Sequence, residues 1–279
     1  MKETTFKRQK RMALINDLTG FGRCSLAVML PIVSAMKVQA CPVPTALLSV
    51  HTGFSSHYIY DCTHLMMPYI DNWEENGLEF DGICTGFFGS AEQIDIAGEF
   101  IKRFRRDNTL VIIDPVMGDH GRLYSSYTKE MCREMRKLVS LADVLTPNLT
   151  EVCELLDIPY PKGGAAGDAA LYEMAQRLAH EGAAKIVITG METAGRINNF
   201  VFEGRQCDSV SSPKIGGERS GTGDAFAAVV AADLINGATL KSAVKKAAAF
   251  VNKTVAYAEE LNLPWNYGLP IEEYLTELR

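Results

Sequence analysis

Short apolar runs typical of strands alternate along this chain with longer segments of helical periodicity. Strands that alternate with helices are joined by crossover connections, which leave neighbouring strands parallel and cover both faces of the sheet. The pattern predicts an α/β fold with a mostly parallel central sheet flanked by helices on both faces. The expected strands are residues 12–15, 38–50, 82–85, 110–113, 144–145 and 185–189. The expected helices are residues 23–36, 60–76, 90–106, 129–139, 148–156, 168–180 and 225–235, with one more helix after Gly237.

Proline and glycine are expected to interrupt several of these elements. A glycine turn is expected soon after Ile15, and Pro31 is expected to kink or bound the first helix. Pro42 and Pro44 are expected to break the second strand. Residues 200–210 alternate in polarity and predict a hairpin.

The chain offers no obvious place to divide it. Its 279 residues are enough for one large domain or two small ones, and 47% of them are hydrophobic, which allows an ample core. No repeat, low-complexity stretch or clear linker separates two halves. Residues 1–11 are basic and predict a flexible tail, and residues 12–279 predict a single domain.

A glycine-rich loop that ends in Gly221-Thr222-Gly223-Asp224 runs directly into the apolar helical segment at residues 225–235. Glycine allows a tight turn and a close approach of the backbone to a ligand. The first N–H groups of a helix lack intrahelical partners, and the helix dipole adds positive charge there, so the loop predicts an anion cradle. In that positive end, Asp224 would stay ionised and could accept a proton from a substrate hydroxyl.

An ordinary capped helix, with Thr222 or Asp224 as the cap, is the alternative interpretation of this loop. The spacing is neither Gly-x-x-x-x-Gly-Lys-Ser/Thr nor Gly-x-Gly-x-x-Gly after a first strand. These differences exclude a Walker A loop and a dinucleotide-binding oxidoreductase.

Acidic and amide side chains follow two more of the expected strands. Asp114 and Asp119 flank the turn after residues 110–113, and Asn148 and Glu151 lie one helical turn apart at the start of a helix. Hard oxygen ligands near an anion cradle predict Mg²⁺, which takes a few carboxylates, waters and substrate phosphates. A capping box formed by Asn148 and Glu151 is the alternative.

Asp17, His51 and Thr52 also lie just past early strands, where they could hydrogen-bond a small polar substrate. Ligands of open α/β sheets bind at loops that leave the carboxyl ends of the strands, and each polar cluster falls in such a loop. That agreement in position predicts an enzyme. A structural role is the alternative for His51, since the other histidines supply no metal-ligand spacing with it.

Aromatic and basic residues near these loops have weaker signals. Phe54, Phe87 and Phe88 could form a stacking wall for an aromatic ring, with core packing as the alternative. Lys214 and Arg219 precede the cradle and could screen phosphate charge, with solvated loop charge as the alternative.

The net charge and the cysteine content limit which partners and which cellular compartment are expected for this chain. The net charge of −6 disfavours nucleic acid or an anionic membrane as the main partner, and no apolar run reaches membrane-spanning length. Seven cysteines lie scattered, without Cys-x-x-Cys pairs. This pattern predicts reduced thiols and a cytoplasmic protein.

Several of these motifs resemble the pyridoxal/pyridoxamine kinases of the ribokinase superfamily, and the resemblance extends over nearly the whole chain after Met12. The matching segments are Ser49–Phe54, Thr85–Gln93, Asp114–Asp119, Thr146–Glu151 and Gly221–Asp224. The resemblance implies a ribokinase-like kinase, usually a homodimer, that phosphorylates the 5′-hydroxymethyl group of vitamin B6 in a salvage reaction.

The same resemblance implies a role for each site residue. ATP phosphates would bind over the amides of Gly221, Thr222 and Gly223, and Asp224 would deprotonate the vitamin hydroxyl. Mg²⁺ would bind at Asp114, Asp119 and Glu151, and many members also use a monovalent cation such as K⁺. The nucleotide would contact Asn148, Thr189 and Lys214. The vitamin ring would contact Asp17, His51, Thr52 and Phe87.

One departure from the family pattern keeps a second substrate open. Asp17-Leu18 replaces the Ser-His that is common after the first strand, and this loop is closer to that of the hydroxymethylpyrimidine kinases of thiamine synthesis. Those kinases often carry Cys where this chain has Asp224, and they lack a close match to His51–Phe54. A non-catalytic B6 or nucleotide sensor is a third reading, but a pure binder has no need of a carboxylate beside an anion cradle.

Overall fold

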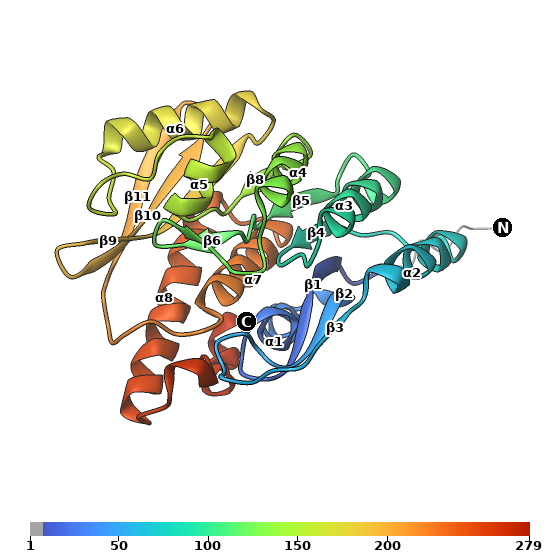
Figure 1. Cartoon of the computed structure of the whole chain (residues 1–279), viewed down its shortest axis with the longest axis horizontal. Helices are drawn as coiled ribbons and strands as arrows, with labels where there is room; N and C mark the ends of the chain where they lie inside the picture. Colours follow the sequence, from blue (N-terminus) through green and yellow to red (C-terminus); the bar gives the residue numbers. More distant parts are fainter. Residues whose placement is uncertain (1–7) are drawn as a thin grey trace.

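The first strand, β1 (Arg11–Phe21), sends its buried side chains alternately into two separate hydrophobic cores. Met12 and Leu14 belong to one core, and Ala13 and Ile15 belong to the other. An interior parallel strand is buried on both faces in this way. In the computed structural model, which describes residues 8–279, β1 lies inside a nine-stranded sheet with helices on both faces (Figure 1).

The remaining strands of this sheet are β2 (Gln39–Val50), β3 (Ile59–Asp61), β4 (Gly82–Thr85), β5 (Leu110–Ile113), β8 (Val144–Leu145), β9 (Lys185–Thr193), β10 (Arg196–Glu203) and β11 (Gln206–Pro213). Their order is β11-β10-β9-β8-β5-β4-β1-β2-β3. The strands from β9 to β2 in this order are parallel, whereas β3, β10 and β11 pair antiparallel at the edges. A separate hairpin consists of β6 (Gly118–Asp119) and β7 (Arg122–Leu123).

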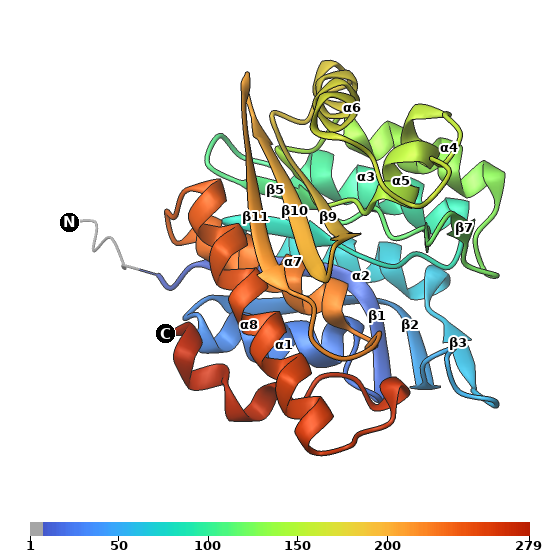
Figure 2. The same cartoon turned by 90° about the vertical axis from the view of Figure 1, so that its left-hand side faces the viewer.

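Helices cover the sheet in two layers. One face carries α1 (Ser25–Ala35), α7 (Thr222–Ile235) and α8 (Leu240–Glu260). The opposite face carries α2 (Thr63–Glu75), α3 (Ala91–Phe104), α4 (Lys129–Val139), α5 (Leu149–Leu156) and α6 (Asp168–His180). Figure 2 shows α1 and α8 together, on the side of the sheet away from α3 and α6. The predicted α/β architecture is confirmed.

Two expectations about the first strands were wrong. The strand expected to end at Ile15 continues to Phe21 through a register shift against β2 between Asn16 and Leu18, and the chain bends only at Gly22, where φ is 95°. Pro42 and Pro44 do not break β2, which is continuous. β3 pairs only with residues 46–48 of β2. At the two prolines, β2 therefore has β1 as its single neighbour, and the missing N–H groups cost no hydrogen bonds to a second strand.

Two helix boundaries also differ from expectation. The helix expected at residues 60–76 starts at Thr63, because Tyr60 and Asp61 belong to the edge strand β3. Pro31 lies inside α1 rather than at its end. The hairpin expected at residues 200–210 is confirmed as part of β10 and β11.

The predicted tail is described only in part. Residues 1–7 lie outside the described residues, and β1 starts at Arg11, one residue before the expected domain boundary. In the short segment between residue 7 and β1, the guanidinium of Arg8 pairs with the carboxylate of Asp81 at 2.6 Å. Within residues 8–279, no helix has the length and apolar character needed to cross a membrane.

Candidate active site

The N-terminus of α7 has the shape expected of an anion cradle. Gly221 precedes the helix in the left-handed region, with φ at 82°, and a Cβ there would lie 1.9 Å from the carbonyl oxygen of Arg23. At Gly223, by contrast, an added Cβ would meet no heavy atom within 4 Å, so space is open above the first turn. Glycine is therefore required at the first position for the turn, while the second leaves room for a ligand.

Neither proposed side-chain cap is present at this helix. α7 begins at Thr222, whose hydroxyl donates to the carbonyl of Arg219 at 3.3 Å, and no side chain caps the helix. The carboxylate of Asp224 accepts from the side chain of Asn16 and the backbone N–H of Ser25. The capping interpretation of this loop is therefore wrong, and the leading helical amides keep the free donors that an anion can use.

The half-buried carboxylate of Asp224 is held by two donors from the opposite side of the site. Its Oδ1 accepts from the side-chain amide of Asn16 at 3.1 Å, and its Oδ2 accepts from the backbone N–H of Ser25 at 2.8 Å. Burial raises the pKa of Asp224, and the two hydrogen bonds act in the opposite direction. Each oxygen still has acceptor capacity for a substrate hydroxyl, so the group can serve as a base.

Asn16 and Ser25 were not expected as site residues from the sequence. Asn16 is only 1% exposed. The sequence signal that could have identified it is its position as a polar residue directly after the apolar part of β1. Ser25 has a φ of 52°, in the left-handed region, and no feature of the sequence predicts this.

A second group of acidic side chains lies near Asp224. Asp114 follows β5, and burial raises its pKa to about 7, with a further contribution from the charge of Asp224 and an opposing hydrogen bond from Thr146 at 3.1 Å. Burial raises the pKa of Glu151 well above its ordinary value, and the charge of Asp114 adds to this. Among residues 8–279, no lysine or arginine pairs with Asp114, Glu151 or Asp224. Buried carboxylates without a cationic partner fit a divalent cation.

Asn148 and Glu151 form the capping box that was considered as an alternative. Asn148 Oδ1 accepts from the Glu151 N–H at 3.0 Å, and Glu151 Oε2 accepts from the Asn148 N–H at 2.8 Å. The other oxygen of Glu151 accepts from the N–H of Met117 at 3.1 Å. The described residues contain no cluster of three or more His, Cys, Asp or Glu arranged as metal ligands. A cation would therefore be held by one or two carboxylates together with water and phosphate.

Asp17 and Phe87 approach Asp224 through their shared contact with Asn16. The backbone N–H groups of Asp17 and Phe87 both donate to Asn16 Oδ1, at 2.9 and 2.8 Å. Asp17 is buried and accepts from the hydroxyl of Thr19 at 3.1 Å. Burial raises the pKa of Asp17 to about 6, and the charge of Asp224 adds to the increase.

His51 and Thr52 differ in their surroundings. His51 Nδ1 accepts from the N–H of Gly53 at 3.1 Å, and Nε2 lies 2.8 Å from the carbonyl oxygen of Asn266, so both ring nitrogens have protein partners. These contacts favour the structural alternative for His51. Thr52 is exposed in the turn that follows β2. Phe88 lies fully buried in a core, so the packing alternative holds for that ring.

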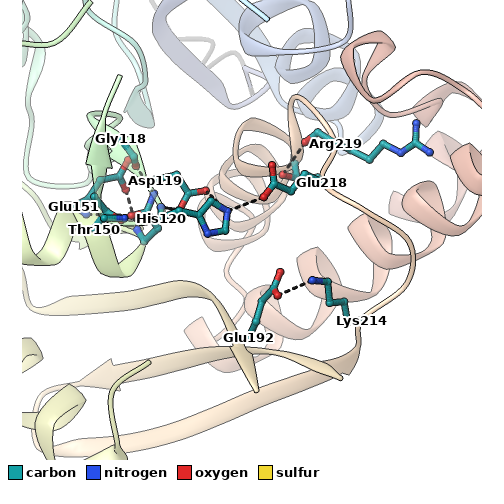
Figure 3. A network of polar contacts seen from close by, with 12 residues as sticks. Gly118, Asp119, His120, Thr150, Glu151, Glu192, Lys214, Glu218 and Arg219 are labelled. Atoms are coloured by element: carbon teal, nitrogen blue, oxygen red, sulfur yellow. Dashed lines mark hydrogen bonds and ion pairs between the residues drawn. The ribbon is translucent and has the colours of Figure 1, made fainter. Parts of the chain in front are cut away.

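Polar contacts link the loops around the cradle (Figure 3). His120, between β6 and β7, reaches Glu218 in the loop before α7, with Nε2 and Oε1 2.9 Å apart. Lys214 pairs with Glu192 at 2.6 Å, so its ammonium is already engaged. The guanidinium of Arg219 pairs with Glu259 at 2.8 Å, which anchors the loop to α8.

Two remaining predicted residues lie on the hairpin side and on β9. Asp119 is exposed, and its Oδ1 accepts from the N–H of His120 at 2.8 Å. Thr189 donates its N–H to the carbonyl of Pro147 at 2.9 Å, which places β9 beside Asn148. The structure thus brings Asn148 and Thr189 together.

The sequence model of the phosphomethylpyrimidine kinase family matches residues 30–268. The chain belongs to this family. A pyridoxine/pyridoxal/pyridoxamine kinase from Bordetella avium is 32% identical over 182 residues, which are 62% of this chain and 59% of the relative. The match therefore spans less than two thirds of that relative's length.

Solved structures of similar proteins cover almost the whole chain. A protein from Bacteroides thetaiotaomicron, described as a phosphomethylpyrimidine kinase, is 36% identical, with a TM-score of 0.95 over 99% of this chain and 96% of that one. A second crystal form of it, with pyridoxal, has a TM-score of 0.90 over 97% and 96%. Pyridoxal kinase from Lactobacillus plantarum is 28% identical, with a TM-score of 0.89 over 96% of both chains. The predicted resemblance to the pyridoxal kinase family of the ribokinase superfamily is confirmed.

Proposed function

We propose that this chain transfers the γ-phosphoryl group of ATP to the 5′-hydroxymethyl group of a B6 vitamer. The observation that carries the proposal is the Asp224 carboxylate, held by Asn16 and Ser25 beside the free amides at the start of α7. A base and an anion cradle then lie within one helical turn, as phosphoryl transfer to an alcohol requires.

The helix start and Asp224 divide the reaction between them. The amides of Thr222 and Gly223 hold the γ-phosphate and the charge that develops on it. Asp224 accepts the hydroxyl proton, the hydroxyl oxygen bonds to the γ-phosphorus, and the bond to the β-phosphate oxygen breaks to release ADP. The open space at Gly223 supports this placement of the phosphate.

Asp114 and Glu151 are the residues that would hold Mg²⁺, through their own oxygens or through water. Bound Mg²⁺ would neutralise phosphate charge and orient the γ-phosphate. Asp119 lies at the exposed edge of this region and would contact the ion's water shell. K⁺ is a further proposed activator, and replacing it with Na⁺ in the assay tests its role.

Vitamer and nucleotide would bind on opposite sides of the γ-phosphate. Asp17, Thr52 and Phe87 would contact the pyridine ring, with His51 holding the end of β2 against the C-terminal segment. Asn148, Thr189 and Lys214 would line the nucleotide side. The pyridoxal in the Bacteroides structure supports the choice of vitamer.

Hydroxymethylpyrimidine is the second candidate substrate. The family model bears the name of phosphomethylpyrimidine kinase, and a hydroxymethylpyrimidine/phosphomethylpyrimidine kinase from Haemophilus influenzae is 30% identical over 203 residues. The acidic Asp17 favours it, whereas Asp224 as the base favours the vitamer.

A cytoplasmic homodimer is the proposed form of the protein. All seven cysteines are free thiols, which fits a reducing compartment. Leu18, Leu47 and Tyr60 are partners across three strands at the sheet edge and are at least 37% exposed. Such an apolar stripe supports self-association, which light scattering of the purified chain would measure.

Phosphorylation assays with purified protein test the proposed function. Pyridoxal, pyridoxamine, pyridoxine and hydroxymethylpyrimidine are each incubated with ATP and Mg²⁺, and the products are identified by mass spectrometry. Phosphorylated vitamer from the wild type, reduced by about 10²-fold or more in Asp224→Asn, is the expected result. Product from hydroxymethylpyrimidine alone would establish the second candidate. Vitamer binding without turnover would indicate a sensor.

A further inference from the structure

We propose that Asn16 is a positioning residue that fixes the Asp224 carboxylate relative to the backbone carrying Phe87. The inference rests on the proposed kinase function, because it concerns the alignment of the base with the vitamer. Asn16 lies at the centre of the site, joined to Asp224 on one side and to Asp17 and Phe87 on the other.

The hydrogen bonds of Asn16 determine which way its amide points. Its Oδ1 accepts two backbone N–H groups, from Asp17 at 2.9 Å and Phe87 at 2.8 Å. Because backbone N–H groups only donate, the Nδ2 group must face the other side, where Asp224 Oδ1 lies at 3.1 Å and Met29 Sδ at 3.4 Å. The amide is 1% exposed and cannot exchange these partners for water. Asn16 therefore presents a fixed donor to the base.

This donor matters because burial and the neighbouring acids both oppose the ionised form of Asp224. Burial raises the pKa of Asp224, and the bond from Asn16 is one of the contacts that lower it. The titratable groups that interact with the charge of Asp224 are all acids, namely Asp17, Cys24, Cys84, Asp114 and Tyr124. Loss of the Asn16 donor would leave the carboxylate with backbone N–H donors alone, those of Ser25 and of Asp224 itself, and shift its titration to higher pH.

The neighbouring Gly86 provides the space that Asn16 needs. A Cβ at Gly86 would lie 2.3 Å from Asn16 Nδ2 and 2.5 Å from its Cγ. Gly86→Ala would therefore displace the amide without changing its chemistry. Gly89 lies three residues further in the same loop, and a Cβ there would meet its nearest atom, Asp61 Oδ2, at 3.5 Å, an ordinary contact. Gly89→Ala is thus a matched control.

The test measures kcat and KM against pH for the wild type, Asn16→Ala, Gly86→Ala and Gly89→Ala. Asn16→Ala and Gly86→Ala are expected to lower kcat by about 10- to 100-fold and to move its acidic limb to higher pH. KM for the vitamer should change less than kcat, and Gly89→Ala should match the wild type. An acidic limb that stays in place in both Asn16→Ala and Gly86→Ala would overturn the proposal, since a merely structural role would lower activity without moving it.

A second measurement separates this inference from the proposed function. If the wild type phosphorylates no vitamer, the proposed function fails, and the Asp224 titration can still be followed by carbon NMR of ¹³C-labelled aspartate. Asp224→Asn assigns its signal. A titration at higher pH in Gly86→Ala than in the wild type supports the role of Asn16, and unchanged titration contradicts it.

Discussion

The carbonyl oxygen of Arg23 occupies the place where a side chain on Gly221 would begin. A Cβ at Gly221 would lie 1.9 Å from this oxygen, although the two residues are far apart in the sequence. This close contact joins the end of β1 and the start of α1 to the N-terminus of α7. It lies beside the Ser25 N–H bond to Asp224, so the packing of three elements sets the position of the base.

Alanine substitutions at the two glycines of the cradle should separate folding from nucleotide binding. Gly221→Ala is expected to destabilise the protein by about 1–3 kcal/mol or more, because the position combines a positive φ with a direct clash. Gly223→Ala should retain the wild-type unfolding temperature but raise KM for ATP, since its methyl group enters the open space at the helix start. Thermal unfolding and ATP kinetics check both. Equal unfolding temperatures for the two variants would contradict the packing argument.

Most helices and strands were predictable from the sequence because each has a local signal. Neighbouring residues determine the apolar strand β5, which occurs where expected. They also determine the capping box of Asn148 and Glu151, which was the alternative to a metal site. β1 was misjudged because Asp17 and Gly20 are typical of turns, and only the pairing of their neighbours with β2 keeps this segment extended. Part of the edge strand β3 was predicted as helix, because its pairing with β2 leaves no signal in the local sequence.

The carboxylates of the candidate site could be predicted from the sequence, but the hydrogen-bond donors that hold them could not. Asp224 and Asp114 follow strand or loop signals that point to the same edge of the sheet. The contact from Asn16 to Asp224 spans 208 residues, and Ser25 donates a backbone group, which no side-chain pattern reveals. The ion pair between Arg219 and Glu259 was not expected, because the two residues lie 40 positions apart in the sequence.

Stability should fall as pH rises from about 4 to 7 in the absence of divalent cations. The pKa values of Asp17 and Asp114 rise on folding from 3.8 to about 6 and about 7, so the folded chain binds more protons than the unfolded chain in this range. The favourable contribution is complete below the unfolded pKa and is lost as pH rises through the folded values. Asp114→Asn should therefore raise the unfolding temperature by several degrees at pH 8 and by little at pH 4, as scanning fluorimetry would show. The exposed Asp119→Asn is the control, and equal shifts in the two variants would sink the argument.

Asp17 should distinguish among the vitamers. A buried carboxylate near the ring site can pair with the amine of pyridoxamine, whereas pyridoxine carries a hydroxyl at that place. Asp17→Ala is expected to raise KM more for pyridoxamine than for pyridoxine, by about tenfold in ratio. Steady-state kinetics at pH 8, above its pKa of about 6, measures this. Equal effects on the two substrates would remove Asp17 from ring recognition.

Mg²⁺ dependence should change with the buried carboxylate more than with the exposed one. Asp114→Asn removes a charge from the group that includes Glu151 and Asp224, and is expected to raise the Mg²⁺ concentration for half-maximal activity by about tenfold or more. Asp119→Asn should raise it by a smaller factor, because that side chain is exposed and faces His120. Isothermal titration of Mg²⁺ with a non-hydrolysable ATP analogue gives a readout independent of turnover. An unchanged Mg²⁺ requirement in Asp114→Asn would rule out this site for the ion.

The pair of His120 and Glu218 should affect ATP binding through charge. Glu218 lies three residues before the cradle, and its carboxylate would repel phosphate unless a protonated His120 compensates it. His120→Ala is expected to raise KM for ATP by a few fold at low salt, with a smaller effect at high salt, because both side chains are exposed. The double variant with Glu218→Gln should restore the wild-type KM, since neither the repulsion nor its compensation remains. Asp208→Asn, which removes the exposed pair with Lys241, is the control. If the double variant is as impaired as His120→Ala, His120 contacts the nucleotide itself and the charge explanation is wrong.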